Sequence, residues 1–369
     1  MTRLLIASLL LMPALLTAAD GRARNVVLFL ADAGGIPTIN AASLHGYGAP
    51  RKLFLQRMAH LGLSDTTAVP HFVNDSAAGM TAIVTGQKTR NGVVGQSDSG
   101  ERGVRDGAPL KSILEYAEER GLSTGIITND AVTGATPAAL YAKANDRGAT
   151  AVIFPQVFAP RFGDGVDVLI GAGRPAIAKA LTAAGLDLDT LARDKGRPLL
   201  TGLSEIAPDA KRAIVLHESA QFPLAEAMQV AVRMLSRNPK GYFLMVEWDT
   251  HTDNLRRGLD RMVELDKVIE QTAQTRKDTL VLFTADHSFD IRVRGGQTGT
   301  PLLDGFDEAE AKRVEEKRRD IRIPAVRMDN GHTADEVLVA AQGPGAARVK
   351  GYMANTDLFK VMMDAFGWK

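Results

Sequence analysis

The sequence contains no cysteine, and this absence excludes several kinds of chemistry. Disulfide bonds, a lipid-modified cysteine, a thiolate nucleophile and a thiolate metal ligand are all ruled out. Any metal ion must therefore be held by aspartate, glutamate, histidine or a hydroxyl group. A chain of 369 residues can bury a core large enough to be stable without disulfide bonds, even in an exported protein.

A strong charge of either sign is also lacking. The net charge is +1, which gives no attraction to nucleic acid or to an anionic membrane surface. The long apolar run at the start combines Arg3, a leucine-rich stretch and the small residues Thr17 and Ala19. This layout is typical of a secretory signal peptide spanning residues 1–19, with an uncleaved anchor as the alternative. We expect export to the periplasm or the medium, with residues 20–369 forming a single domain.

Strand-like and helix-like segments alternate along the chain. Apolar, β-branched runs of strand length occupy residues 25–32, 123–130, 167–173, 213–218, 241–249 and 279–287, and helical spacing of apolar residues marks 223–238 and 255–274. This alternation predicts the α/β class, as a three-layer α/β/α sandwich with a mostly parallel central sheet.

Polar side chains follow three of these predicted strands. Asp32 ends the first, Glu247 and Asp249 end another, and Asp286 and His287 end a third. In sheets of this kind, ligands gather at the carboxyl ends of the strands. Carboxylates placed close together repel one another, and a bound cation relieves the repulsion. We therefore expect one or two divalent ions at this edge of the sheet.

The segment "VNDSAAGMTAIVTG" places Ser76 directly after an acidic residue and before a helical stretch. Serine is a common residue at a helix start, where its hydroxyl accepts a hydrogen bond from a free N–H group. It is also a possible nucleophile, but the local pattern taken alone favours the helix cap.

Several segments, in the same order along the chain, together resemble the alkaline phosphatase family. They are "NVVLFLADAGG", "NDSAAGMTAIVTGQKT", "ATPAALYAKANDR", "DVLIGAGR", "NPKGYFLMVE", "TADHS" and "GHTADEVLVAAQGPGA", and they run from Asn25 to about Gly345. Several independent matches are far more specific than any one motif. The resemblance implies an alkaline-phosphatase-like fold and hydrolysis of small phosphate monoesters.

The resemblance also implies roles for individual residues. Ser76 would be the nucleophile, forming a phosphoserine intermediate, and Arg147 would bind two phosphate oxygens. Two zinc ions and a third, magnesium-type ion would be bound by a set of acids, imidazoles and hydroxyls: Asp32, Ser76, Asp286 and His287 at the first site, Asp249, His332 and a nearby partner at the second, and Thr136 and Glu247 at the third.

Three departures from the family pattern concern these metal sites. Gly134 stands where the family has an acid or a histidine, which puts the magnesium site in doubt. Glu247 and Asp249 are two residues apart instead of five. The family then has a histidine four residues after that aspartate, where this chain has Asp253. We expect Asp253 to complete the second zinc site because an i, i+4 pair shares one helical face, with His251 as the alternative. A carboxylate there would also make manganese, calcium or magnesium better candidates.

Other features leave alternatives open. The chain is short for the family, so either a monomer or a homodimer is expected, without nucleic acid or membrane partners. Residues 288–330 are predicted to be an insertion over the cleft. A phosphodiesterase with the same two-metal centre, or a non-catalytic metal-binding secreted protein, are the alternative functions.

Overall fold

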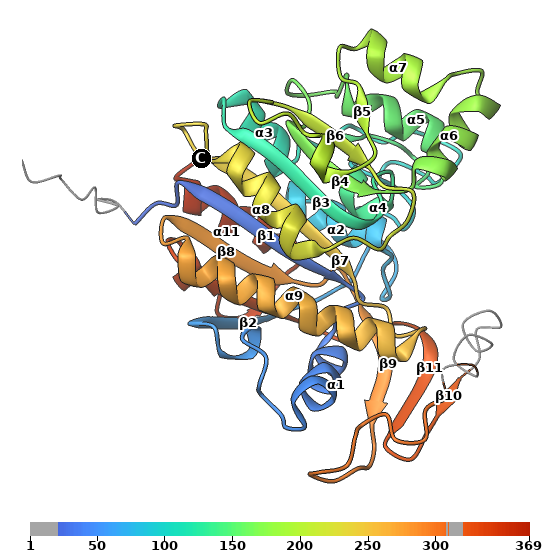
Figure 1. Cartoon of the computed structure of the whole chain (residues 1–369), viewed down its shortest axis with the longest axis vertical. Helices are drawn as coiled ribbons and strands as arrows, with labels where there is room; N and C mark the ends of the chain where they lie inside the picture. Colours follow the sequence, from blue (N-terminus) through green and yellow to red (C-terminus); the bar gives the residue numbers. More distant parts are fainter. Residues whose placement is uncertain (1–20, 308, 310–319) are drawn as a thin grey trace, which may run out of the picture.

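The computed structural model describes residues 21–307, 309 and 320–369, and its centre is a ten-stranded, mostly parallel sheet (Figure 1). The predicted signal peptide lies outside the described residues. Within the described part of the chain, no helix is long and apolar enough to cross a membrane. The strands of the main sheet, in spatial order, are β13 (Gly351–Met353), β2 (His60–Ser64), β12 (Val337–Gln342), β8 (Thr279–Thr284), β1 (Asn25–Asp32), β7 (Tyr242–Asp249), β3 (Ser123–Ala131), β4 (Val168–Ala172), β6 (Ala213–Leu216) and β5 (Leu199–Leu200).

The strands predicted from apolar runs form the middle of this sheet. The continuous parallel block runs from β8 through β1, β7, β3, β4 and β6 to β5, and its central strands are buried along nearly their whole length. Burial on both faces explains why these strands are continuously apolar, because neither face meets water. Strand β12 is antiparallel to both β8 and β2, which adds a short mixed edge to the sheet.

Helices cover both faces, so the predicted three-layer α/β/α sandwich is confirmed. The helices are α1 (Ile36–Tyr47), α2 (Ser76–Thr85), α3 (Ile113–Glu119), α4 (Ala135–Tyr141), α5 (Thr150–Ile153), α6 (Arg174–Ala183), α7 (Leu188–Asp194), α8 (Leu224–Leu235), α9 (Leu255–Thr275) and α11 (Asp357–Phe366). Helices α8 and α9 lie on one face, where Leu259 and Met262 join an apolar core with β1 and β7 (Figure 1). Helices α2, α3, α4 and α11 enclose a second core on the other face.

Three strands that follow His287 in the chain form a second, smaller sheet. Strands β9 (Ser288–Val293), β11 (Val326–Thr333) and β10 (Ile321–Arg322) pair antiparallel beside the end of the main sheet (Figure 1). Because β9 begins directly after His287, this small sheet lies next to the edge of the main sheet that carries the polar residues. Whether it is an insertion that covers the cleft stays a prediction.

Candidate metal and phosphate site

The carboxyl ends of the central strands bring the strand-end acids together. Strands β1 and β7 pair in parallel with Asp32 opposite Asp249 and Leu30 opposite Glu247. Strand β8 pairs with the other side of β1, so its following residues, Asp286 and His287, emerge beside Asp32. The convergence predicted from the sequence therefore follows directly from the register of three neighbouring parallel strands.

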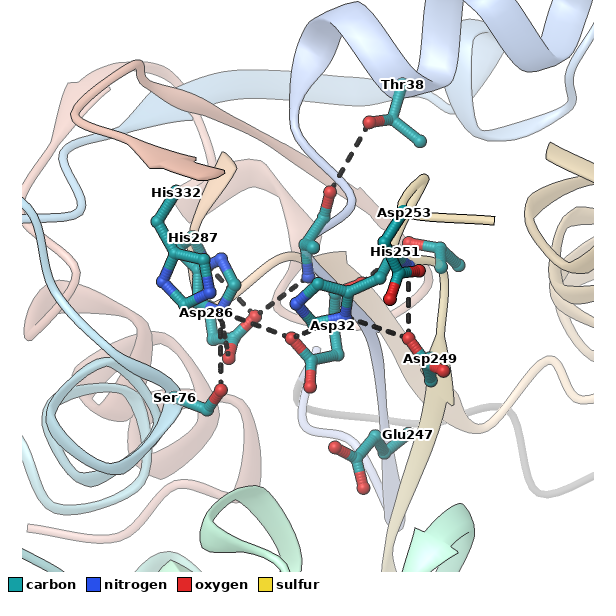
Figure 2. Close-up of polar contacts among 12 residues, drawn as sticks. Asp32, Thr38, Ser76, Glu247, Asp249, His251, Asp253, Asp286, His287 and His332 are labelled. Carbon is teal, nitrogen blue, oxygen red and sulfur yellow. Dashed lines mark hydrogen bonds and ion pairs between the residues drawn. The ribbon is translucent and has the colours of Figure 1, made fainter. Parts of the chain in front are cut away.

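Ser76 is the first residue of α2, and the helix cap is its neighbour. Asp75 is the N-cap residue, and its side chain accepts a hydrogen bond from the backbone N–H of Ala78 (3.0 Å). The Ser76 hydroxyl is therefore free to face the site, and its Oγ lies 3.3 Å from Nε2 of His287 (Figure 2). Gly79 permits this approach, because a Cβ there would lie 2.7 Å from the carbonyl oxygen of Asp286. The cap and the candidate nucleophile are thus adjacent residues.

Three imidazoles gather at this edge. The rings of His287 and His332 stack with centroids 3.7 Å apart, and the ring of His251 lies 5.6 Å from that of His287. One ligand atom from each of the three lies within 4.8 Å of the others. Nδ1 of His332 contacts the carbonyl oxygen of Asn74 (3.1 Å), which ties β11 to the loop before Ser76. Burial and the neighbouring His287 lower the pKa of His332 to about 4, so this imidazole is neutral at pH 7.

A second group joins His287 to two buried carboxylates. Asp32, Asp286 and His287 also have ligand atoms within 4.8 Å of one another. Nε2 of His287 lies 3.2 Å from Oδ1 of Asp32 and 3.4 Å from Oδ2 of Asp286 (Figure 2). Burial and the charge of Asp32 raise the pKa of Asp286 to about 6. Burial also opposes ionisation of Asp32, but His251 and His287 outweigh it and hold the pKa of that carboxyl below its usual value.

The short loop after β7 places His251, and not Asp253, among the imidazoles. Nδ1 of His251 contacts Oδ1 of Asp249 at 2.8 Å, which turns its ring toward the cluster (Figure 2). Asp253 lines the same cleft, but its carboxylate accepts a hydrogen bond from the backbone N–H of Asn254 (2.7 Å). Among the described residues, the groups with ligand atoms in mutual reach include His251 and lack Asp253. The geometry therefore favours His251 over Asp253 as the ligand. The argument from an i, i+4 pair on one helical face does not apply, because α9 begins only after Asp253.

The second carboxylate oxygen of Asp249 has a partner that the sequence analysis did not consider. Nη1 of Arg261, on α9, lies 2.6 Å from Oδ2 of Asp249. Arg261 and Asp249 are twelve residues apart, and the only sequence signal is a basic residue on the helix that follows the strand. Asp249 is thus held between a guanidinium and an imidazole.

Arg147 lies in the same cleft, close to the start of α2. Its Nη1 is 3.1 Å from Oδ2 of Asp75, so one carboxylate both caps α2 and positions the guanidinium. A single cleft is lined by the following residues: Asp32, Ser76, Asp130, Arg147, Asp249, His251, Asp253, Phe289, Gly331 and His332. The structure thus brings the candidate nucleophile, the candidate phosphate-binding arginine and most of the candidate metal ligands to one place.

The residues expected at the third site lie deeper in the same edge of the sheet. Glu247 is 1% exposed, accepts a hydrogen bond from the hydroxyl of Thr128 (2.5 Å) and is also hydrogen-bonded to Thr136. Burial and the charges of Asp32 and Asp130 raise the pKa of Glu247 well above its usual value. Asp130 was missed by the sequence analysis, although it ends a predicted strand and so carries the same signal as the other strand-end acids.

These donor sets fit divalent cations. The first site combines carboxylates, an imidazole and the serine hydroxyl, and the three clustered imidazoles are ligands that zinc prefers. The third site offers only oxygen atoms, which suit magnesium. The buried carboxylates raise one another's pKa values, as expected for a site that needs a cation to be stable.

Comparison with known proteins decides the family. The model of the family described as alkaline phosphatase matches residues 23–204 and 187–318, which is most of the chain. The chain belongs to the alkaline phosphatase family. It is 27% identical to the alkaline phosphatase of Escherichia coli over 95% of this chain and 88% of that protein. It is 29% identical to a streptomycin-6-phosphate phosphatase from Streptomyces griseus, over 94% of this chain and 91% of the relative.

Membership of the family holds across relatives of different length. The rat tissue-nonspecific alkaline phosphatase is 30% identical over 75% of this chain, and the matched region spans 65% of that longer protein. The solved alkaline phosphatases from Thermus thermophilus and from the Antarctic bacterium TAB5 superpose with TM-scores of 0.76 and 0.75, at 22% and 23% identity. They cover 94% of this chain and 92% and 99% of their own, which confirms the alkaline-phosphatase-like fold.

Proposed function

We propose that this protein is a metal-dependent phosphohydrolase that cleaves phosphate monoesters through a phosphoserine on Ser76. The observation that carries the proposal is the position of the Ser76 hydroxyl. It lies at the N-terminus of α2, 3.3 Å from His287, in the cleft that also contains Arg147 and the clustered imidazoles. Family membership supports the same reaction class.

Two zinc ions held by the imidazole and carboxylate groups, with magnesium at the third site, would neutralise the phosphoryl group and activate the serine hydroxyl and water. Asp32, Ser76, Asp286 and His287 would hold one zinc ion, and His251 and His332 the other, with Asp249 beside His251. Thr136 and Glu247 would belong to the magnesium site.

The side chains of the cleft supply the rest of the chemistry. Oγ of Ser76 attacks phosphorus, the bond from phosphorus to the ester oxygen breaks, and the alcohol leaves. Water then attacks the phosphoserine, the Oγ–phosphorus bond breaks, and inorganic phosphate and free Ser76 are released. Ser76 brings the N-terminus of α2 to the cleft, where the positive end of the helix dipole would favour the phosphoryl oxygens. The planar guanidinium of Arg147, held by Asp75, matches two phosphate oxygens.

The favoured substrate class is the monoester. A monoester carries three non-bridging oxygens, enough for both the cations and the Arg147 fork, whereas a diester has only two. The streptomycin-6-phosphate phosphatase among the relatives indicates that the alcohol part of the substrate varies within the family. Export of the protein stays a prediction that accompanies this function.

Ser76→Ala tests the nucleophile. Purified protein is stripped with a chelator, reloaded with zinc and magnesium, and assayed with 4-nitrophenyl phosphate and bis(4-nitrophenyl) phosphate. We expect the monoester to be preferred and the Ser76→Ala variant to lose on the order of 10³-fold or more in turnover. Ser219→Ala, on an exposed loop, is the matched control and should be unaffected. A diester preference, or retained turnover in Ser76→Ala, would refute the proposal.

A further inference from the structure

Gly134 and Asp130 compete for the same space. An ideal Cβ on Gly134 would lie 2.9 Å from Oδ2 of Asp130 and 2.9 Å from the carbonyl oxygen of Ala131, closer than real Cβ contacts occur. The φ angle of Gly134 is −54°, which any residue adopts, so the backbone conformation does not require glycine here. The neighbouring carboxylate of Asp130 therefore fills the volume that a side chain at position 134 would enter.

Asp130 continues a row of oxygen groups that starts at Glu247. Its backbone N–H donates to Oγ1 of Thr128 (2.9 Å), and the Thr128 hydroxyl donates to Glu247. Thr128 and Asp130 lie in the last part of β3, where its register with β4 shifts between Ile127 and Ala131. Thr136, in the first turn of α4, is hydrogen-bonded to the same Glu247 carboxylate. Asp130 is exposed and lines the cleft, so it stands at the open end of this row.

The row carries negative charge, and the nearest basic charge recorded for it is that of Arg147, which acts on Asp130 across the cleft. Within the described ranges, neither Glu247 nor Asp130 makes an ion pair, and the hydrogen bonds recorded for the buried Glu247 carboxylate come from two hydroxyl groups. Carboxylates and a hydroxyl open to water on one side are the donors that Mg²⁺ prefers, because this ion retains several of its own water ligands.

We propose that Asp130 supplies the acidic oxygen group of the third cation site, from the end of β3, in place of a side chain at position 134. The inference rests on the proposed function, because it completes the magnesium-type site named there. The third site then keeps an acidic ligand although Gly134 has no side chain, because the carboxylate comes from a residue four positions earlier in the chain.

The test uses Mn²⁺ as a paramagnetic probe of the third site in the full-length protein loaded with two zinc ions. Free and bound Mn²⁺ are measured by electron paramagnetic resonance in the unmodified protein, in Asp130→Asn and in Asp130→Ala/Gly134→Asp. We expect Asp130→Asn to bind Mn²⁺ at least about tenfold more weakly. In the double variant, truncation of Asp130 removes one of the two close contacts of a side chain at position 134, and the Ala131 carbonyl has to move by a few tenths of an ångström to relieve the other. This variant should recover most of that loss. Asp194→Asn, which removes one exposed carboxylate on α7, controls for net charge and should bind Mn²⁺ unchanged.

Unchanged Mn²⁺ binding in Asp130→Asn would overturn the inference, as would a loss that Gly134→Asp does not reverse. The zinc content of each variant, measured by mass spectrometry, shows whether the two-zinc centre is intact. Hydrolysis of 4-nitrophenyl phosphate by the unmodified protein separates the two proposals. Active protein with unaltered Mn²⁺ binding in Asp130→Asn overturns only the role of Asp130, whereas inactive protein overturns the proposed function whatever Mn²⁺ does.

Discussion

The choice between His251 and Asp253 as a ligand of the second zinc site leads to a direct prediction. We compare His251→Ala with Asp253→Asn. His251 has a ligand atom within 4.8 Å of His287 and His332 and is oriented by Asp249 at 2.8 Å. The carboxylate of Asp253 accepts a hydrogen bond from the backbone N–H of Asn254, and its Oδ1 lies 3.9 Å from Nη2 of Arg257.

The magnitudes follow from these contacts. Loss of even an outer partner of a metal site costs about 10–100-fold in metal affinity, so loss of the imidazole itself should weaken zinc binding at this site by at least about 100-fold, or about 2.7 kcal/mol. Asp253→Asn keeps an oxygen that can accept the Asn254 hydrogen bond and removes one charge at the edge of the cleft. We expect a change of about threefold or less, because water screens the charge of a carboxylate at a partly exposed position.

The assay is competition for zinc with a chromophoric chelator, followed for each variant at fixed pH. The unmodified protein should hold two tight zinc ions and His251→Ala one. Asp253→Asn should resemble the unmodified protein. The reverse pattern, with tight binding retained in His251→Ala and lost in Asp253→Asn, would show that the loop after β7 rearranges when a cation binds and would refute the reading of the geometry.

Two further predictions concern the phosphate-binding fork and the stability of the fold. Arg147→Lys should raise KM and the inhibition constant for inorganic phosphate by about tenfold or more. Lysine keeps the positive charge but cannot make the two parallel hydrogen bonds of the guanidinium that Asp75 holds in place. Equal inhibition by phosphate in Arg147→Lys and in the unmodified protein would contradict a direct role of Arg147. Burial raises the pKa of Glu118 to about 7, so the unfolded chain ionises this group from about pH 4.5 while the folded protein keeps its proton. The free energy of unfolding that the buried Glu118 takes from the protein therefore grows between about pH 4.5 and pH 7 and is constant above pH 7. The stability of Glu118→Gln relative to the unmodified protein should therefore rise by up to about 3 kcal/mol between pH 4 and pH 7 in denaturant titrations; a difference independent of pH would contradict this.

The parallel block of the sheet was predictable because its strands are buried on both faces. The runs at residues 25–32 and 241–249 are so continuously apolar that their boundaries agree with β1 and β7 to within a residue. Strands β2, β12 and β13, which follow β8 on one side of the sheet, have no such signal, because they are short and partly exposed, and their pairing is set by contacts distant in sequence. The same limit applies to β9, β10 and β11, whose small sheet depends on tertiary context.

The site was predictable as a set of residues but not as a set of contacts. Any acid at the end of a central parallel strand arrives at the same edge, so Asp32 and Asp249 could be placed together before their register was known. Helical periodicity suggested Asp253 because it treats the segment after β7 as part of a helix. The chain instead makes a tight loop up to Asn254, the N-cap of α9, and a loop has no fixed period from which a ligand can be chosen.

Asp130 shows how the strand-end rule could have been applied more fully. Asp130 ends its predicted strand as Asp32 ends another, so the same strand-end pattern predicts that it lies at this edge of the sheet, whereas Gly134 belongs to the segment before α4. Where two segments pack against each other at a site, either one can supply the carboxylate, provided that the facing residue of the other segment has no side chain. Gly134 and Asp130 satisfy this condition, because a Cβ at one position would touch the carboxylate of the other. The absence of a side chain in one segment therefore predicts a compensating side chain in the segment packed against it, and such pairs become visible only once the register is known.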